Sequence, residues 1–148
     1  PISCTLEKVS LEDSPKYSAL SYRWGGTGRQ ILVNEKPFTV TNKLEIALQH
    51  LQKDSDPLTL WVDAICINQQ DTEEKMQQVR QMTDIYRSAS QVLIWLGPAA
   101  DGSDQVINSL QLISQVFQRQ DLSNHIKKLC HREWWTRTWV IQELCVPK

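Results

Sequence analysis

The feature that most constrains the fold is a nearly continuous apolar run at residues 58–67, whose only charged member is Asp63. A short apolar run of this kind is typical of a strand buried on both faces of a parallel sheet. A second such run occupies residues 91–96 and is stopped by a Gly-Pro pair. A third strand is predicted near residues 18–24, where a glycine-rich turn follows. The chain therefore contains three candidates for the strands of one buried sheet.

Amphipathic helices are predicted between and after these strands. Asn42 and Glu45 form a capping-box pattern ahead of apolar residues at helical spacing. Asp71 and Glu74 repeat that pattern before a second helix. The apolar stripes are Leu44, Ala47, Leu48 and Leu51 in the first helix, Met76, Val79, Met82 and Tyr86 in the second, and Val106, Leu110, Ile113 and Phe117 in a third. This alternation predicts an α/β fold, with a flavodoxin-like, mainly parallel sheet flanked by helices and a small β-hairpin near residues 31–40.

Composition limits the class of protein. The 148 residues carry a net charge of −1 and are 41% hydrophobic, which suits a single domain with a core. Near-neutral charge gives no reason to expect nucleic acid or an anionic membrane as partner, and no apolar run approaches the roughly 20 residues of a membrane span. Four scattered cysteines favour a reducing compartment, so we expect a cytoplasmic location. Because the chain starts without Met and stops after its strongest motif, we expect residues 1–148 to be one domain of a longer multidomain protein.

That strongest motif is the tryptophan-rich segment at residues 132–144. If the segment is helical, Trp135, Trp139 and Glu143 recur every four residues and share one face. An aromatic wall beside a carboxylate could hold a flat, cationic or ribose-bearing ligand. The alternative is that the tryptophans belong to the core and Glu143 is a solvated charge, and periodicity alone favours this alternative.

Further polar groups lie where the predicted strands end. Asp63 should hold a hydrogen-bonding or charged partner, because burying an unpaired carboxylate is unfavourable. It contacts a ligand or ties down a neighbouring loop or helix N-terminus. Trp24 precedes a glycine-rich turn, through which backbone can approach a ligand closely. Asn68 and Gln69 are more often turn residues than ligand contacts. The Cys130-His131 pair with His125 matches no zinc spacing, so no metal site is predicted.

Three motifs resemble the heterokaryon incompatibility (HET) domain of filamentous fungi. They are residues 20–25 (Leu-Ser-Tyr-Arg-Trp-Gly), residues 61–69 (Trp-Val-Asp-Ala-Ile-Cys-Ile-Asn-Gln) and residues 134–143. The resemblance spans residues 17–144. Its departures are minor: Glu35 stands where the hairpin usually carries glycine, and Trp135 stands where another aromatic residue is usual.

HET domains are in turn distantly similar to TIR domains, and the resemblance implies a function. The TIR pattern has a strand ending in Ser-Tyr, like Ser21-Tyr22, and a later helix with Trp, then Glu, then Leu, like Trp139, Glu143 and Leu144. In catalytic TIR domains that glutamate is essential for cleaving NAD, so the resemblance makes Glu143 the candidate catalytic residue. The residues implied more loosely as substrate-binding are Tyr22, Arg23, Trp24, Gly25, Asp63, Asn68, Arg137 and Trp139.

The chemistry is compatible with one carboxylate. Nicotinamide leaves NAD as a neutral molecule, so no acid is needed, unlike in ordinary glycosidases. Glu143 could stabilise an oxocarbenium-like ribose, while Arg23 or Arg137 could bind the pyrophosphate. No GxGxxG motif follows the first strand, so Rossmann-type binding is not indicated.

Three hypotheses remain open. The first is a self-associating NAD hydrolase that triggers cell death, with NAD as substrate, no cofactor, and flanking regulatory domains in the full-length protein. The second is a signalling module that acts by homotypic assembly, and the third is a nucleotide-binding sensor without turnover.

Overall fold

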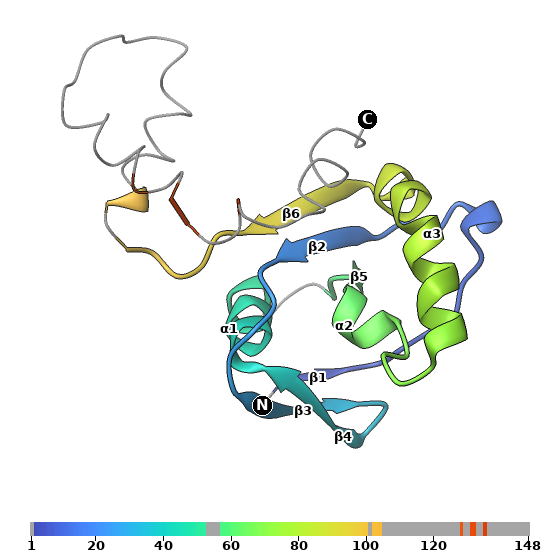
Figure 1. Ribbon diagram of the computed structural model, residues 1–148, viewed down its shortest axis with the longest axis horizontal. Coiled ribbons are helices and arrows are strands. Elements are labelled where there is room, and N and C mark those ends of the chain that lie inside the picture. The colour runs from blue at the N-terminus through green and yellow to red at the C-terminus, as the bar shows by residue number, and fades with distance from the viewer. Residues whose placement is uncertain are drawn as a thin grey trace, which may run out of the picture.

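The computed structural model describes residues 2–52, 57–100, 102–104, 128, 131–132 and 135. Within them, three parallel strands form a sheet in the order β5-β2-β6 (Figure 1). These strands are β2 (Ser18–Tyr22), β5 (Leu60–Trp61) and β6 (Gln91–Trp95). The predicted strands near residues 18–24 and 91–96 are confirmed, and the domain is a mixed α/β structure.

The central strand β2 is buried along its whole length and packs against helices on both faces. Leu20 and Tyr22 belong to a core cluster with residues of α1 (Asn42–Leu51). Ala19 packs instead in a second cluster with residues of α3 (Thr72–Ser88), among them Tyr86. This burial on both faces explains why the strand lacks polar alternation in its sequence.

A β-hairpin follows β2, as the sequence predicts. It consists of β3 (Gly28–Val33) and β4 (Lys36–Thr41), which pair antiparallel, and β1 (Ser3–Cys4) extends the sheet by pairing parallel with β3. A short 3-10 helix, η1 (Leu11–Asp13), lies between β1 and β2. The two residues of the hairpin turn, Asn34 and Glu35, have φ of 49° and 63°. Positive φ at both positions is the geometry of a type I′ turn, which suits the twist of the hairpin.

The helix caps agree closely with the sequence signals. For α1 the N-cap is Thr41, one residue earlier than predicted, and its side chain accepts a hydrogen bond from the Leu44 N–H. For α3 the N-cap is Asp71, as predicted, and its carboxylate accepts hydrogen bonds from two backbone N–H groups of the first turn. The predicted stripe of α3 is wrong at its first position, because Met76 is exposed while Met82 and Tyr86 are buried.

The predicted strand at residues 58–67 is wrong over its second half. The strand β5 covers two residues of this run, and α2 (Asp63–Cys66) is a single helical turn. The Val62 carbonyl accepts hydrogen bonds from the N–H groups of Ile65 and Cys66, and the Asp63 carboxylate accepts one from the Ala64 N–H. A short apolar run does not distinguish a buried strand from a buried helical turn, and here the acidic residue at its centre begins a helix.

The predicted helix with the stripe at residues 106–117 lies outside the described residues, and within the tryptophan-rich segment only residues 132 and 135 are described. Within the part of the chain that is described, none of the helices combines the length and apolar character needed to cross a membrane.

Candidate functional site

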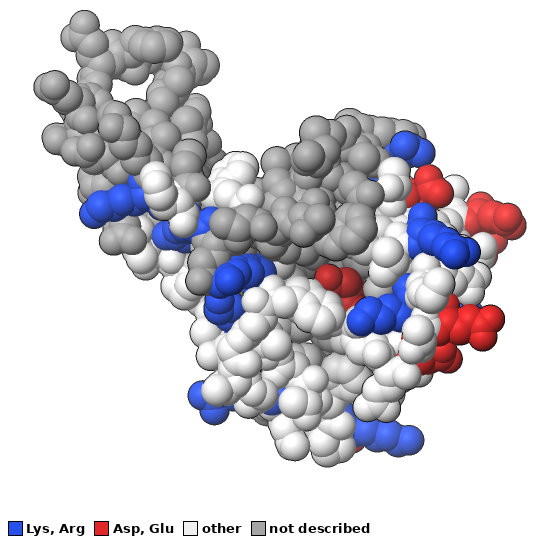
Figure 2. Space-filling view, in the orientation of Figure 1, with Lys and Arg blue, Asp and Glu red and all other residues white. Residues whose placement is uncertain are grey.

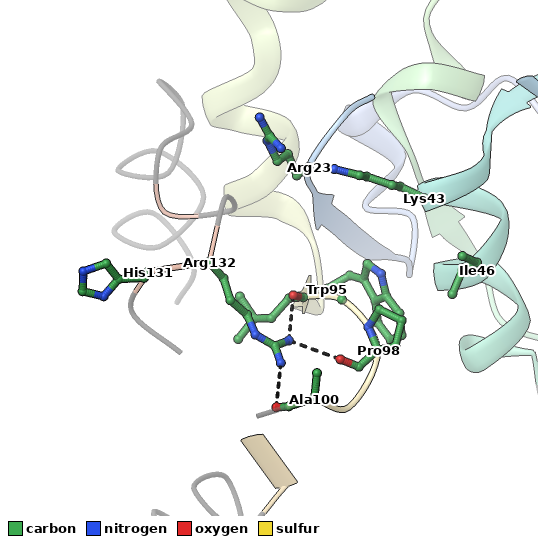
Figure 3. A pocket seen from close by; sticks show the side chains of 10 residues that line it. Arg23, Lys43, Ile46, Trp95, Pro98, Ala100, His131 and Arg132 are labelled. Carbon is green, nitrogen blue, oxygen red and sulfur yellow. Dashed lines mark hydrogen bonds between the residues drawn. The ribbon is translucent and has the colours of Figure 1, made fainter. Parts of the chain in front are cut away.

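A pocket of about 320 Å³ opens at the carboxyl ends of β2 and β6 (Figure 3). It is lined by Arg23, Lys43, Ile46, Trp95, Leu96, Gly97, Pro98, Ala100, His131 and Arg132. After β2 the chain crosses to β5 on one side, and after β5 it returns to β6 on the other side of β2. Where connections diverge in this way, a crevice forms at the carboxyl ends of parallel strands, and ligands of open α/β sheets bind there. The pocket occupies that position.

The described residues that line the pocket carry positive charge. Arg23, Lys43 and Arg132 line it, and the described lining residues include no carboxylate. On the face that Figure 2 shows, Asp and Glu lie mainly toward the right, over α3 and η1. Clustered cations that face a concave surface attract anionic ligands and raise their local concentration.

Arg132 also builds one wall of the pocket. Its guanidinium donates hydrogen bonds to three backbone carbonyls of the loop after β6, at distances of 2.8 Å to Leu96, 3.4 Å to Pro98 and 3.2 Å to Ala100 (Figure 3). The planar, multidonor guanidinium is suited to holding several acceptors in one arrangement. Arg132 therefore ties the first residue of the tryptophan-rich segment to the loop after β6.

Asp63 connects the loop after β2 to α2. Its Oδ2 accepts a hydrogen bond from the Trp24 indole Nε1 at 2.8 Å, and its Oδ1 accepts one from the Ala64 N–H at 2.7 Å. The Gln69 side-chain amide donates to the Asp63 carbonyl oxygen at 3.0 Å. The prediction that Asp63 is buried and partnered is confirmed. These contacts match the alternative in which Asp63 ties down a neighbouring loop.

The glycine-rich loop after Trp24 lies tightly against α1. Gly25 and Gly26 have φ of 122° and 99°. A Cβ atom on Gly26 would stand 1.8 Å from the Asn42 Oδ1 atom. The Asn42 N–H also donates to the Thr27 carbonyl at 2.8 Å. The loop therefore requires glycine at Gly26, both for its backbone conformation and for close approach to the helix.

Two other predicted site residues, Tyr22 and Asn68, are not among the residues that line the pocket. Tyr22 is 1% exposed and packs in the core between the sheet and α1. Asn68 lies in an exposed turn, where its side-chain oxygen accepts a hydrogen bond from the Gln70 N–H, so it serves as a turn residue. Glu143, Arg137 and Trp139 lie outside the described residues.

Three pocket residues were not singled out from the sequence. Trp95 was predicted as part of the strand at residues 91–96 and not as a site residue, and Lys43 carried no prediction of its own. Arg132 begins the tryptophan-rich motif, but nothing local indicates that it reaches a loop 36 residues earlier. The sequence does indicate that the loops after the predicted strands 18–24 and 91–96 meet at one edge of the sheet, because the carboxyl ends of parallel strands lie together.

Cys66 is the described thiol nearest to the Asp63 contacts. It accepts a hydrogen bond from the Val62 N–H at 3.4 Å. Burial is the main cause that raises the pKa of this thiol above its ordinary value of 9.0. A raised pKa keeps the thiol protonated, which argues against a role as a nucleophile. Among the described residues, no group of three or more His, Cys, Asp or Glu side chains is arranged to hold a metal ion.

Fold and site together define an α/β domain with a cation-lined pocket at the carboxyl edge of a parallel sheet. The chain belongs to the heterokaryon incompatibility (HET) family, whose model matches residues 17–143. It is similar to heterokaryon incompatibility protein 6, OR allele, of Neurospora crassa, with 42% identity over 129 residues. The match covers 77% of this chain and 19% of the relative, so the chain spans about a fifth of that protein's length. No solved structure gives a significant match.

Proposed function

We propose that this chain is the effector domain of a fungal incompatibility protein, and that it triggers cell death by hydrolysing NAD to nicotinamide and ADP-ribose products after self-association. The observation that carries the proposal is the cation-lined pocket at the carboxyl ends of β2 and β6. Membership of the HET family and the name of the Neurospora relative support the role in incompatibility.

The strand order supports a nucleotide as the ligand. With β2 in the centre, the order β5-β2-β6 corresponds to the first three strands of a flavodoxin-like sheet. In that fold the nucleotide lies at the switch point between the first and third strands, which here are β2 and β6. A TIR-like domain would use the same edge of the sheet, and this likeness is part of the proposal.

Two described pocket residues and Glu143 have roles in the proposed reaction. Arg23 meets the pyrophosphate, and the Trp95 ring forms an apolar wall against which a flat ring could pack. Glu143 follows Arg132 in the same segment, and Arg132 is bound to the rim of the pocket. The role of Glu143 is to stabilise positive charge on the ribose as neutral nicotinamide leaves.

A second candidate is a non-catalytic module that signals by homotypic assembly. The observation that favours it is the exposure of large apolar side chains, since Trp24 and Trp135 are each 42% exposed and Met76 is 53% exposed. Exposed apolar surface marks many association sites. A sensor that binds nucleotide without turnover is the third candidate.

The test is to incubate the purified chain with NAD at high protein concentration and to measure released nicotinamide by chromatography. We expect cleavage by the wild type, a specific activity that rises with protein concentration, and no cleavage by Glu143→Ala or Glu143→Gln at unchanged melting temperature. If Glu143 only supports the core, Glu143→Gln should preserve activity and Glu143→Ala should lower the melting temperature. Full cell killing by a well-folded Glu143→Ala variant would favour assembly instead.

A further inference from the structure

We infer that Arg132 is a positioning residue for the ligand of the pocket: its guanidinium holds the loop after β6 as a wall, and the pocket binds a nucleotide only while that wall is held. The inference rests on the proposed function for the choice of a nucleotide, but it requires binding alone and no cleavage. Arg132 acts through the loop and not through a contact of its own with the ligand.

The contacts of Arg132 hold the loop along its length. Its Nη1 donates to the carbonyl oxygens of Leu96 at 2.8 Å and Pro98 at 3.4 Å, and its Nη2 donates to that of Ala100 at 3.2 Å (Figure 3). These three loop residues line the pocket, as Arg132 itself does. One side chain therefore spans the whole wall.

The loop is suited to a cation with several donors. Backbone carbonyls are obligatory acceptors, and three that converge on one place need donors that reach them together. Pro98 has no N–H and can only accept. The loop also runs close beside the guanidinium, since a Cβ atom on Gly97, whose φ is 103°, would stand 3.7 Å from Arg132 Nη1. A planar, forked guanidinium fits this arrangement of acceptors.

Local hydrogen bonds hold the backbone on both sides of this contact. The Ala100 N–H donates to the Ser103 Oγ at 3.2 Å, and the Ser103 N–H donates back to the Ala100 carbonyl at 2.9 Å. On the other side, the Trp135 N–H donates to the Arg132 carbonyl at 3.1 Å. The guanidinium thus joins two segments that each have a local structure of their own. Removing it should release the wall of the pocket and leave the sheet folded.

The geometry separates the position of the guanidinium from its charge. In Figure 3 the Arg132 guanidinium points toward the carbonyls of the loop and away from Arg23 and Lys43. A lysine at position 132 would keep the positive charge, but its single nitrogen cannot replace two nitrogens that donate to different carbonyls. Arg132→Lys should therefore behave like a loss of the wall, whereas a residue that acts by charge alone would tolerate it.

The experiment combines hydrogen exchange of the ligand-free chain with titration calorimetry, in which ADP-ribose is the probe. In Arg132→Gln and in Arg132→Lys, we expect amide exchange within residues 96–100 to rise about tenfold, because a hydrogen bond to a charged group is lost and the loop opens locally. Exchange in β2 and α1 should stay as in the wild type. The affinity for ADP-ribose should fall about tenfold in both variants, and ADP-ribose should slow exchange of the loop in the wild type alone, since a ligand stabilises the state that it binds.

Arg87→Lys is the matched control. Arg87 is an exposed arginine that donates to Asp84 at 3.1 Å, and it lies near the end of α3, just before β6 begins and so away from the carboxyl edge of the sheet. This variant should leave both loop exchange and ADP-ribose affinity unchanged.

Three results would overturn the inference: an ADP-ribose affinity that Arg132→Lys retains, loop exchange that neither Arg132 variant changes, or an equal loss of affinity in Arg87→Lys. If Arg132→Gln does not fold, Arg132→Lys decides by itself. A wild-type chain that does not bind ADP-ribose would also overturn it.

The inference and the proposed hydrolase can fail separately. ADP-ribose binding that depends on Arg132, in a chain that never releases nicotinamide from NAD, would uphold the positioning role and refute the hydrolase. NAD cleavage with an unchanged KM in both Arg132→Lys and Arg132→Gln would uphold the hydrolase and refute the positioning role.

Discussion

Replacing Trp24 with phenylalanine tests whether the hydrogen bond to Asp63 holds the loop after β2 in place. The change keeps an aromatic ring but removes the Nε1–H that donates to Asp63 Oδ2 at 2.8 Å. A hydrogen bond to a charged group contributes about 1.5–3 kcal/mol to stability. Because Trp24 is 42% exposed, water can replace part of the lost bond. We therefore expect Trp24→Phe to lower the free energy of unfolding by about 1.5 kcal/mol, the low end of that range.

Urea denaturation measures this loss directly, and thermal unfolding should show a melting temperature lower by about 3–6 °C. Asp63→Asn is the partner variant, because the two carboxylate oxygens accept from two donors, the Trp24 indole and the Ala64 N–H, and an amide keeps one acceptor oxygen. In a double-mutant cycle, Trp24→Phe should cost much less in the Asp63→Asn background than in the wild type. If the two losses add to within about 0.5 kcal/mol, the residues are not coupled and this reading of the contact is wrong.

Three further predictions follow from single sites. Gly26→Ala should destabilise the chain by more than about 1 kcal/mol beyond Gly25→Ala in urea denaturation, because both strain a positive φ but only a Cβ on Gly26 meets Asn42; equal losses would contradict the clash. Glu35→Gly should raise the free energy of unfolding by about 0.5–1 kcal/mol, since glycine adopts the φ of 63° in the hairpin turn without strain; a loss of stability would count against it. Iodoacetamide should alkylate Cys66 slowly in the folded chain and rapidly in urea, because burial raises the pKa of this thiol in the folded state. The stability that depends on the protonated thiol is fully present below pH 9.0, and it is lost as the pH rises through the folded-state pKa. Equal alkylation rates in both states would refute it.

Elements whose signals are local could be predicted from the sequence. The Asp71 cap and the apolar spacing after it specified α3, because a capping side chain and the residues it bonds lie within one helical turn. The hairpin could likewise be predicted from two short apolar runs around a turn, and the family resemblance was recognised from three motifs. Residues 91–96 were recognised as a strand because the Gly-Pro pair that ends them left an apolar run too short for a helix.

The conformation of the apolar run at residues 58–67 and the role of its acidic residue depend on contacts with distant segments, which the sequence does not reveal. Asp63 is the first residue of a helical turn. One oxygen of its carboxylate accepts a hydrogen bond from the Ala64 N–H in that turn, and the other accepts one from the Trp24 indole, 39 residues earlier. The pocket was equally hidden, since Lys43 and Arg132 have no common local pattern. They meet because β2 and β6 pair side by side, which places the start of α1 and the loop after β6 at one edge of the sheet. Periodicity reports which face of an element is apolar, whereas the partner that covers that face is set by packing between distant segments.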